Sequence, residues 1–375
     1  MEKATYFEKV PVNTPGGGYD VCVGRNTLEV TLPPLLASLM PNSVAVISHP
    51  GLLELYGERL RFLIEASFAG NVRTLFYSFP DGEEHKDLET LKEAYGALLR
   101  FGITRYDVLL AFGGGVVGDL AGFVAATYMR GLRYLQVPTT LMAMVDSSIG
   151  GKVGIDLPEG KNLVGAFYQP EAVLVDVDYL ATLPAREMRS GLAEVAKYGF
   201  LYDEGILVEM ERWQDGLPDE DYDFVPLVMA CARQKASVVS EDERDLSGRR
   251  ARLNYGHTFG HALEAATGYR ALRHGEAVAL GMIMAARMAE LFWSFATGFT
   301  ERHLRILLPL LKEVRLPRGL TADDVMEYME RDKKKRGELS LILLMRWQAP
   351  VLVNSPPLDL VRRAVDEVLK EVCSR

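Results

Sequence analysis

Short apolar segments alternate with amphipathic ones through the first half of the chain. The apolar segments are rich in valine, leucine, isoleucine and aromatic residues, and they cover residues 21–24, 43–48, 72–79, 108–112, 134–137 and 172–177. Segments with a helical period lie between them, at residues 52–66, 88–101 and 120–130. Nearly continuous apolar runs are typical of strands buried on both faces. The alternation therefore predicts a parallel sheet that is covered by helices on both sides.

The pattern becomes mostly helical after Leu183-Pro184, where the proline suits the first turn of a helix. Helical periods cover residues 185–200, 224–239, 259–266, 276–295 and 302–311. A chain of 375 residues is also too long for one comfortable hydrophobic core. We therefore predict two domains, an α/β domain over residues 1–183 and an all-α domain over residues 184–375.

The composition excludes several classes of protein. Hydrophobic residues make up 48% and charged residues 25%, which argues against extensive disorder. The net charge of −9 disfavours non-specific binding to nucleic acid, although clustered lysines can still bind a phosphorylated small molecule. Cys22, Cys231 and Cys373 are far apart and form no CxxC pair, which fits a reducing compartment. Because no signal core and no long apolar run is present, we expect a cytoplasmic protein without a membrane span.

A glycine-rich run, Phe112-Gly113-Gly114-Gly115-Val116-Val117-Gly118-Asp119, follows an apolar strand and opens a helix. Glycines let a phosphate approach the backbone, and the N-terminus of the helix offers N–H donors and the positive end of a dipole. This arrangement predicts a site for a dinucleotide, although the run is not a strict GxGxxG fingerprint. A tight turn between strand and helix is the alternative interpretation.

Other segments of the α/β domain carry polar residues where strands end. Asp81-Gly82-Glu83-Glu84-His85-Lys86 offers carboxylates for ribose hydroxyls, and Val137-Pro138-Thr139-Thr140 offers two hydroxyl groups. A long connection between strands adds an aspartate, an asparagine and two lysines beside glycines, at Asp146, Asn162, Lys152 and Lys161. Because lysine acts as a point charge for phosphate, this connection predicts an anion site. The alternatives are a solvated acidic turn for the first segment, a proline-bearing turn for the second and a surface loop with ordinary lysines for the connection.

Three of the six histidines, His257, His261 and His274, fall within one short stretch. His257 and His261 are four residues apart and would lie on one face of a helix, a spacing that can chelate a metal. The glutamate that follows the first histidine in metalloproteases is absent. Glu194, which precedes Lys197 by three residues on another helical segment, is a candidate carboxylate ligand. Imidazole and carboxylate ligands without cysteine predict a catalytic zinc or a similar divalent ion.

With these motifs, the chain resembles the 3-dehydroquinate synthase family of sugar-phosphate cyclases. The similarity extends from about Asp81 to Ala279, and the motifs that carry it occur in the same order: GGGVVGD, VPTT, DSSIGGK, GKNLVGAFYQP, SGLAEVAKYG and LNYGHTFGHALE. The resemblance implies a Rossmann-like NAD-binding domain followed by a helical domain that binds metal and substrate. It also implies a distant relationship to iron-type alcohol and glycerol dehydrogenases.

The resemblance further implies roles for individual residues. The metal ligands would be Glu194, His257 and His274. The residues that would bind NAD are Asp81, Gly82, Glu83, Lys86, Gly114, Gly115, Val116, Val117, Gly118, Asp119, Thr139, Thr140, Lys152, Lys161 and Thr182. The residues that would act on the substrate are Arg130, Asp146, Lys152, Asn162, Lys197, Lys235, Arg250, Asn254, His261 and Lys334. By the same resemblance Arg130 reaches the site of a neighbouring subunit, which implies a homodimer, and Lys334 is the favoured one of three consecutive lysines.

Members of this family convert 3-deoxy-arabino-heptulosonate 7-phosphate to 3-dehydroquinate and phosphate, a step of the shikimate pathway toward aromatic amino acids. The resemblance implies that NAD is reduced and reoxidised within each turnover and that one zinc or cobalt ion assists. One alternative is a cyclase for a sugar phosphate that lacks a carboxylate, and Arg250 with Asn254, as carboxylate-binding residues, argues against it. The other is an oxidoreductase of the glycerol dehydrogenase type, in which Lys152, Lys161 and Asn162 would have no phosphate to bind.

Overall fold

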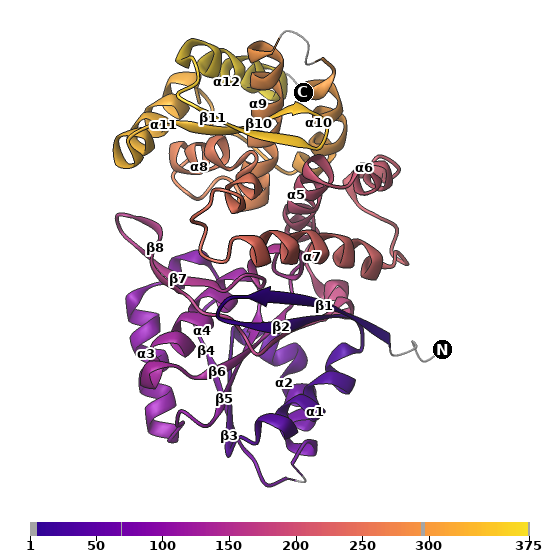
Figure 1. Ribbon diagram of the computed structural model, residues 1–375, viewed down its shortest axis with the longest axis vertical. Helices are drawn as coiled ribbons and strands as arrows, with labels where there is room; N and C mark the ends of the chain where they lie inside the picture. Colours follow the sequence, from indigo (N-terminus) through magenta and orange to yellow (C-terminus); the bar gives the residue numbers. More distant parts are fainter. Residues whose placement is uncertain (1–5, 69, 294–296, 374–375) are drawn as a thin grey trace. The chain divides into compact units, whose positions relative to one another are not determined.

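The computed structural model describes residues 6–68, 70–293 and 297–373, without the side chains of residues 214 and 332–336 (Figure 1). Packing divides the chain into two units. Unit 1 comprises Met1–Leu183 and Phe224–Arg244, and unit 2 comprises Pro184–Asp223 and Asp245–Arg375. Residues 224–244 lie beyond the predicted boundary at residue 183 and yet pack with unit 1, so a single cut in the chain does not separate the two units.

Unit 1 is built on a sheet that has seven strands in the described residues. In spatial order they are β1 (Tyr6–Thr14), β2 (Gly17–Arg25), β9 (Ala172–Asp176), β6 (Arg133–Pro138), β5 (Val108–Gly113), β3 (Ser43–Ser48) and β4 (Arg73–Ser78). Only β1 and β2 pair antiparallel, and the other neighbours are parallel, which confirms the predicted parallel sheet. The sequence pattern missed β1, because charged residues and a proline interrupt its apolar positions.

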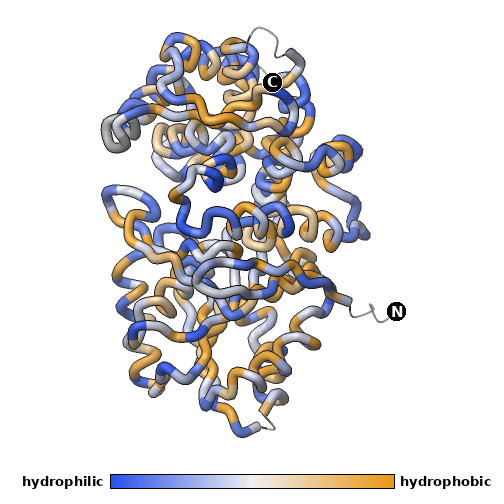
Figure 2. Tube along the Cα trace, in the orientation of Figure 1, coloured by the Kyte–Doolittle hydropathy of each residue, from blue (hydrophilic) through white to orange (hydrophobic). Residues whose placement is uncertain are grey.

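Five helices pack on this sheet: α1 (Thr27–Leu39), α2 (Pro50–Ala66), α3 (Leu88–Phe101), α4 (Gly115–Thr127) and α7 (Phe224–Glu241). Every residue of β3, β5 and β9 is buried, and Figure 2 shows mostly hydrophobic residues along the central strands. Helix α7 joins unit 1 through β1, where the Asn13 N–H donates to Ser240 Oγ at 3.1 Å and Arg233 pairs with Glu8 at 3.0 Å. Helical periodicity in a sequence does not reveal such a partner.

A β-hairpin, which the sequence pattern had suggested only as a lysine-rich connection, follows β6. Its strands are β7 (Lys152–Leu157) and β8 (Gly160–Phe167), and a short π-helix, η3 (Ala143–Ser147), precedes them. Gly154 faces Gly165 across the hairpin, and a Cβ atom on Gly154 would lie 2.6 Å from the Val164 carbonyl oxygen. The hairpin packs on α4, so its polar residues are held near the glycine-rich run.

Unit 2 is mainly helical, as predicted. Its helices are α5 (Ala185–Leu201), α6 (Glu204–Met210), α8 (His257–Ala266), α9 (His274–Phe292), α10 (Phe299–Leu307), α11 (Ala322–Arg336) and α12 (Leu358–Cys373). A second hairpin of β10 (Ser340–Arg346) and β11 (Ala349–Asn354) is an addition that the helical periods did not indicate. Helix α9 is buried along most of its length and packs against α5, α8, α10 and α12.

Short 3-10 helices complete the chain, namely η1 (Glu83–His85), η2 (Tyr128–Arg130), η4 (Val177–Thr182), η5 (Gln214–Gly216), η6 (Arg250–Asn254) and η7 (Leu308–Leu311). Several of them carry residues that the sequence singled out. Among the described helices, none has the length and hydrophobicity that crossing a membrane requires.

Candidate active site

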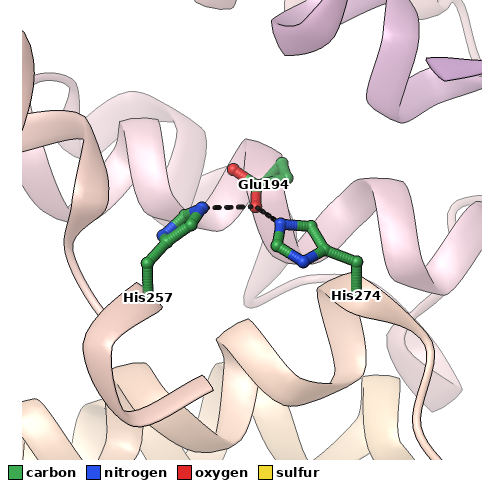
Figure 3. Close-up of side chains that lie close together, drawn as sticks. All are labelled: Glu194, His257 and His274. Carbon is green, nitrogen blue, oxygen red and sulfur yellow. Dashed lines mark ion pairs between the residues drawn. The ribbon is translucent and has the colours of Figure 1, made fainter. Parts of the chain in front are cut away.

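Glu194, His257 and His274 converge in unit 2 (Figure 3). Glu194 lies in the second half of α5, and the two histidines are the first residues of α8 and α9. The Nε2 atoms of His257 and His274 lie 3.6 Å and 3.7 Å from the same carboxylate oxygen, Glu194 Oε1. One ligand atom from each residue lies within 4.8 Å of the others, so the three side chains could hold one metal ion.

An ion pair between Arg186 and the buried Glu276 holds the start of α9 near α5. Glu276 accepts two hydrogen bonds from the guanidinium group of Arg186, at 2.6 Å and 2.8 Å. It also accepts one from the backbone N–H of Arg273 at 2.8 Å, which caps the first turn of α9. Because Arg186 lies on α5, these bonds set the position of His274 relative to the helix that carries Glu194.

The Glu194 carboxylate is buried, and neither of its oxygens has a hydrogen-bond partner in the described part of the chain. Lys197, one turn later on α5, forms an ion pair with Oε2, and only 1% of the Lys197 side chain is exposed. Lys197 offsets the charge at Oε2, whereas a buried oxygen without a hydrogen-bond partner, as Oε1 is among the described residues, is costly unless a cation completes its surroundings. The residues present therefore fit a divalent ion at Oε1, the oxygen that faces both histidines.

The protonation of His257 also suits a metal ligand. Burial, and then the positive charge of Lys197, hold the pKa of His257 well below its usual value, so the ring is neutral near pH 7. Its Nδ1 lies 3.2 Å from the Tyr255 carbonyl oxygen and must donate to it, because a carbonyl oxygen only accepts. The lone pair therefore lies on Nε2, the nitrogen nearer to Glu194.

His261 and Glu264 form a second group with His274. The His261 ring centroid lies 5.6 Å from that of His257 and 5.9 Å from that of His274. The Nδ1 atom of His274 lies 3.6 Å from Oε1 of Glu264, a carboxylate that is 3% exposed. His261, Glu264 and His274 could also hold a metal, but the unsatisfied carboxylate of Glu194 favours the first group. The sequence prediction missed Glu264, although its position three residues after His261 was a usable signal.

The predicted glycine loop begins between β5 and α4 in unit 1 and continues into the start of the helix. Gly114 precedes α4, and the first residues of α4 are Gly115, Val116, Val117, Gly118 and Asp119. Gly114 is the N-cap of α4 and provides no side-chain cap for the first N–H groups of the helix. Thr139 donates its N–H to the Gly113 carbonyl oxygen at 3.0 Å, and a Cβ atom on Gly114 would lie 3.0 Å from the Thr140 methyl carbon. The structure thus brings the two predicted threonines against the loop.

A group that we call the Lys86 cluster, consisting of Glu83, Lys86, Asp119, Asp156 and Asn162, lies beside this loop. Lys86 Nζ lies 2.8 Å from Glu83, 2.8 Å from Asn162, 3.3 Å from Asp119 and 3.6 Å from Asp156. Burial lowers the pKa of Lys86, but the three carboxylates outweigh it and raise that pKa above its usual value. Burial raises the pKa of Asp119 to about 6. Asp156 is a member that the sequence prediction missed.

The remaining predicted cofactor residues follow the carboxyl ends of strands. Asp81 and Gly82 lie between β4 and η1, where Asp81 is exposed and Gly82 has a φ of +126°. Lys161, on β8, acts electrostatically on Glu83. Thr182 ends η4, and its hydroxyl oxygen lies 2.8 Å from that of Tyr56 on α2.

The predicted substrate residues of unit 1 come together only in part. Lys235 on α7 donates to Asp146 Oδ1 at 2.8 Å, so these two predicted substrate residues are in direct contact. Lys152 begins β7, on the hairpin that carries Asn162. Arg130 is exposed at the end of η2, and its side chain forms no hydrogen bond or ion pair with the described residues.

In unit 2, η6 carries two predicted substrate residues just before the histidines. Arg250 is buried, with 3% exposed, and Asn254 is exposed three residues before His257. Lys334 belongs to α11, but its side chain lies outside the described residues.

Comparisons with known proteins identify the family of this chain. Residues 76–190 match the family model for the 3-dehydroquinate synthase N-terminal region, and residues 191–335 match the one for its C-terminal region. The chain belongs to the 3-dehydroquinate synthase family. It is 46% identical over 330 residues to the 3-dehydroquinate synthase of Pelobacter propionicus, covering 87% of this chain and 89% of that protein. It is 42% identical over 376 residues to that of Bordetella pertussis, covering 97% and 100%.

Solved structures related to this 3-dehydroquinate synthase family member include other cyclases. The structure of 2-deoxy-scyllo-inosose synthase with carbaglucose-6-phosphate, NAD+ and Co2+ has a TM-score of 0.80, 25% identity and coverage of 96% of this chain and 99% of that one. The structure of 2-epi-5-epi-valiolone synthase from Streptomyces hygroscopicus, with NAD+ and Zn2+ bound, has a TM-score of 0.79, 25% identity and coverage of 100% and 99%. A protein from Sinorhizobium meliloti described as a probable glycerol dehydrogenase shares the fold, at 18% identity and a TM-score of 0.59, covering 99% of this chain and 100% of that one.

Proposed function

We propose that the protein is a 3-dehydroquinate synthase, a carbon–oxygen lyase that converts 3-deoxy-arabino-heptulosonate 7-phosphate to 3-dehydroquinate and inorganic phosphate. The observation that carries the proposal is the group of Glu194, His257 and His274. In it, a buried carboxylate without hydrogen bonds faces two imidazole nitrogens, in residues that the family resemblance assigns to the metal. The identities of 42% and 46% to curated relatives of that name support the same reaction.

Glu194, His257 and His274 would hold one zinc or cobalt ion. When bound, such an ion polarises a substrate hydroxyl group and lowers its pKa, which favours loss of hydride from the same carbon. The neutral ring of His257 supports this assignment, as do the Co2+ and Zn2+ of the two solved cyclases. Lys197 forms an ion pair with Glu194 and would supply positive charge for an anionic group of the substrate.

Unit 1 would bind NAD, which when bound accepts a hydride and returns it before the product leaves. The uncapped N–H groups at the start of α4 would donate to its pyrophosphate, and Thr139 and Thr140 lie against the same loop. The carboxylates of Glu83 and Asp119 would accept hydrogen bonds from hydroxyl groups of the cofactor. The NAD+ in the two solved cyclases supports this placement.

The substrate has a phosphate at one end and a carboxylate at the other, and each needs its own donors. Lys152 and Asn162 would contact the phosphate, because ammonium and amide groups donate to phosphate oxygens. Arg250 has the fork of donors that suits a carboxylate, and Asn254 lies one turn further along the chain. His261 would donate to the substrate rather than bind the metal.

We also propose a homodimer in which Arg130 reaches the site of a second copy. If so, mixing the inactive variants Arg130→Ala and Glu194→Ala should restore part of the activity. In a mixed dimer, one site combines the intact Glu194 of one subunit with the intact Arg130 of the other. A mixture that stays inactive after subunit exchange has been verified would refute this arrangement.

One assay tests the reaction. Purified protein with NAD and Zn²⁺ or Co²⁺ should release inorganic phosphate from the heptulosonate phosphate without net NADH formation, and Glu194→Ala should abolish this release. Steady accumulation of NADH with a polyol would instead identify a dehydrogenase. Phosphate release from sedoheptulose 7-phosphate alone would identify a cyclase for substrates without a carboxylate, which the fold of the two solved cyclases makes the nearest alternative.

A further inference from the structure

Lys86 joins the loop after β4 to the β7–β8 hairpin. Its ammonium group donates to Asn162 Oδ1 at 2.8 Å, and its backbone carbonyl oxygen accepts the N–H of Asp156 at 2.7 Å. Asp156 in turn accepts the backbone N–H of Asn162 at 2.7 Å. Asn162 is therefore held at two points. Its side chain is bonded to Lys86, and its main chain is bonded to Asp156, which is itself bonded to Lys86.

The chemistry of these bonds fixes the orientation of the Asn162 amide. An ammonium group has three donors and no acceptor, so the atom that faces Lys86 must be the amide oxygen. The NH2 group is then the remaining functional end of an exposed side chain, and Nδ2 has no hydrogen-bond partner among the described residues. The backbone of Asn162 has a φ of +54°, in the left-handed region that asparagine tolerates better than most residues. Asn162 is thus presented as a donor and not as an acceptor.

One cation is next to this NH2 group in sequence, and a second lies on the same hairpin. Lys161 directly precedes Asn162 on β8, whereas Lys152 begins β7 and pairs with Phe167 at the other end of the hairpin. The negative charges close to Asn162, on Glu83, Asp119 and Asp156, all lie within 3.6 Å of Lys86 Nζ. Only 3% of the Lys86 side chain is exposed. Because it is enclosed in this way, the Lys86 ammonium group acts through the side chains that it contacts.

We propose that Lys86 is a positioning residue that aims the Asn162 NH2 group at the phosphate of the substrate. The family resemblance assigns Lys86 to NAD, and the proposed role is additional to that contact. The proposal rests on the proposed function, because it needs Asn162 to meet a phosphate. It distinguishes Lys86, which acts through another side chain, from Lys152, which would touch the phosphate itself.

A double-mutant cycle tests this role. The dissociation constant of inorganic phosphate is measured by calorimetry on NAD-saturated wild type, Lys86→Met, Asn162→Ala and the double variant, with the affinity for NAD measured separately. Each single change should weaken phosphate binding by about tenfold, the effect expected for one charge-assisted hydrogen bond. The double variant should bind phosphate within about twofold of Asn162→Ala, since residues in one network are not additive. Three results would overturn the proposal. They are multiplicative losses of affinity in the double variant, unchanged phosphate affinity in Lys86→Met, and a wild type that does not bind phosphate specifically.

A second variant replaces the NH2 donor while keeping the size of the side chain. Asn162→Asp keeps an oxygen for Lys86 but replaces the NH2 group by a negative oxygen, so phosphate should bind at least tenfold more weakly while the thermal midpoint is maintained. Wild-type phosphate affinity in Asn162→Asp would show that the NH2 group is no donor and would refute the inference. Because these measurements need only phosphate binding, a wild type that fails to turn over the heptulosonate phosphate contradicts the proposed function and leaves this result interpretable.

Discussion

Gly275 lies so close to Ser190 that a Cβ atom placed on it would be 2.0 Å from the Ser190 carbonyl oxygen. The Gly275 N–H also donates to Ser190 Oγ at 3.1 Å. Helices α5 and α9 therefore meet backbone to backbone at this point. Since His274 directly precedes Gly275 and Glu194 lies one turn beyond Ser190, the contact sets the separation of two proposed metal ligands.

Gly275→Ala should therefore damage the protein in two measurable ways. The added methyl group must push α5 and α9 apart, which lowers the free energy of unfolding by about 1–3 kcal/mol or more in urea titrations. The same shift should weaken Zn²⁺ binding, because Glu194 and His274 would no longer share one ion at good distances. Gly57→Ala is the matched control, since its Cβ atom would meet only the Leu53 side chain at 3.7 Å within α2. That change should raise stability by up to about 1 kcal/mol, and equal losses in both variants would contradict the argument.

Glu264 should act on the metal through His274. A carboxylate near Nδ1 fixes the proton on that nitrogen and leaves Nε2 for the ion, and losing such a partner typically weakens metal binding by about 10–100-fold. We expect Glu264→Gln to raise the dissociation constant for Co²⁺ within that range, measured by competition with a chelator. The visible spectrum of the bound Co²⁺ should keep its shape, because the three ligands are unchanged. If Glu264 is itself a ligand in the second group, the spectrum will change and Glu194→Gln will retain the ion.

The histidine cluster shows where sequence reasoning about the site succeeds and where it stops. The spacing of His257 and His261 predicts a chelating pair on one helix face, and the two rings are indeed neighbours. The carboxylate beside His257 comes from another helix, and helical periodicity does not say which helices will meet. That depends on local contacts such as the one between Gly275 and Ser190. The residue pattern offered Glu194 as a candidate ligand, and the family motifs were needed to assign it to the metal.

In unit 1, the parallel strands and the glycine loop follow from the sequence, because buried parallel strands are nearly continuous apolar runs, whereas the antiparallel β1 was missed. The hairpin over residues 152–167 does not, since glycines and lysines interrupt the alternation that identifies a strand. Asp156 escaped notice for the same reason. Its importance comes from its bonds to Lys86 and Asn162, which are distant from one another in sequence.

Replacing Met129 by glycine should not destabilise the folded protein, because the backbone of Met129 is strained. Its φ of +49° places a side chain in the left-handed region just before Arg130, which has a φ of +66°. Relief of this strain should offset the greater flexibility of glycine in the unfolded chain, so Met129→Gly should leave the free energy of unfolding unchanged or raise it by up to about 1 kcal/mol. Met345 on β10 is equally exposed at 39% and gives a matched control. Met345→Gly should lower stability by about 0.5–1 kcal/mol, and a loss of that size at Met129 would show that its backbone is not strained.

His303 should make the protein sensitive to acid. Its Nδ1 donates to the Phe299 carbonyl oxygen at 2.7 Å, so Nε2 must accept the hydroxyl proton of Tyr255 at 2.9 Å. Burial lowers the pKa of His303 to about 3, whereas the unfolded chain would titrate near the ordinary value of 6.5. The unfolded state then binds a proton first, so this contribution to stability is complete above pH 6.5 and is lost as the pH falls from 6.5 towards 3.

The double variant Tyr255→Phe/His303→Phe removes both the titrating ring and its hydroxyl partner. Between pH 6 and 4, its free energy of unfolding should fall less steeply with acid than that of the wild type, by up to about 1.4 kcal/mol for each pH unit. Tyr255→Phe alone keeps His303, so it should lose about 1 kcal/mol at every pH and retain the steep slope. Identical slopes in the wild type and the double variant, measured by urea titration, would show that His303 is already protonated in the folded protein or does not govern its acid sensitivity.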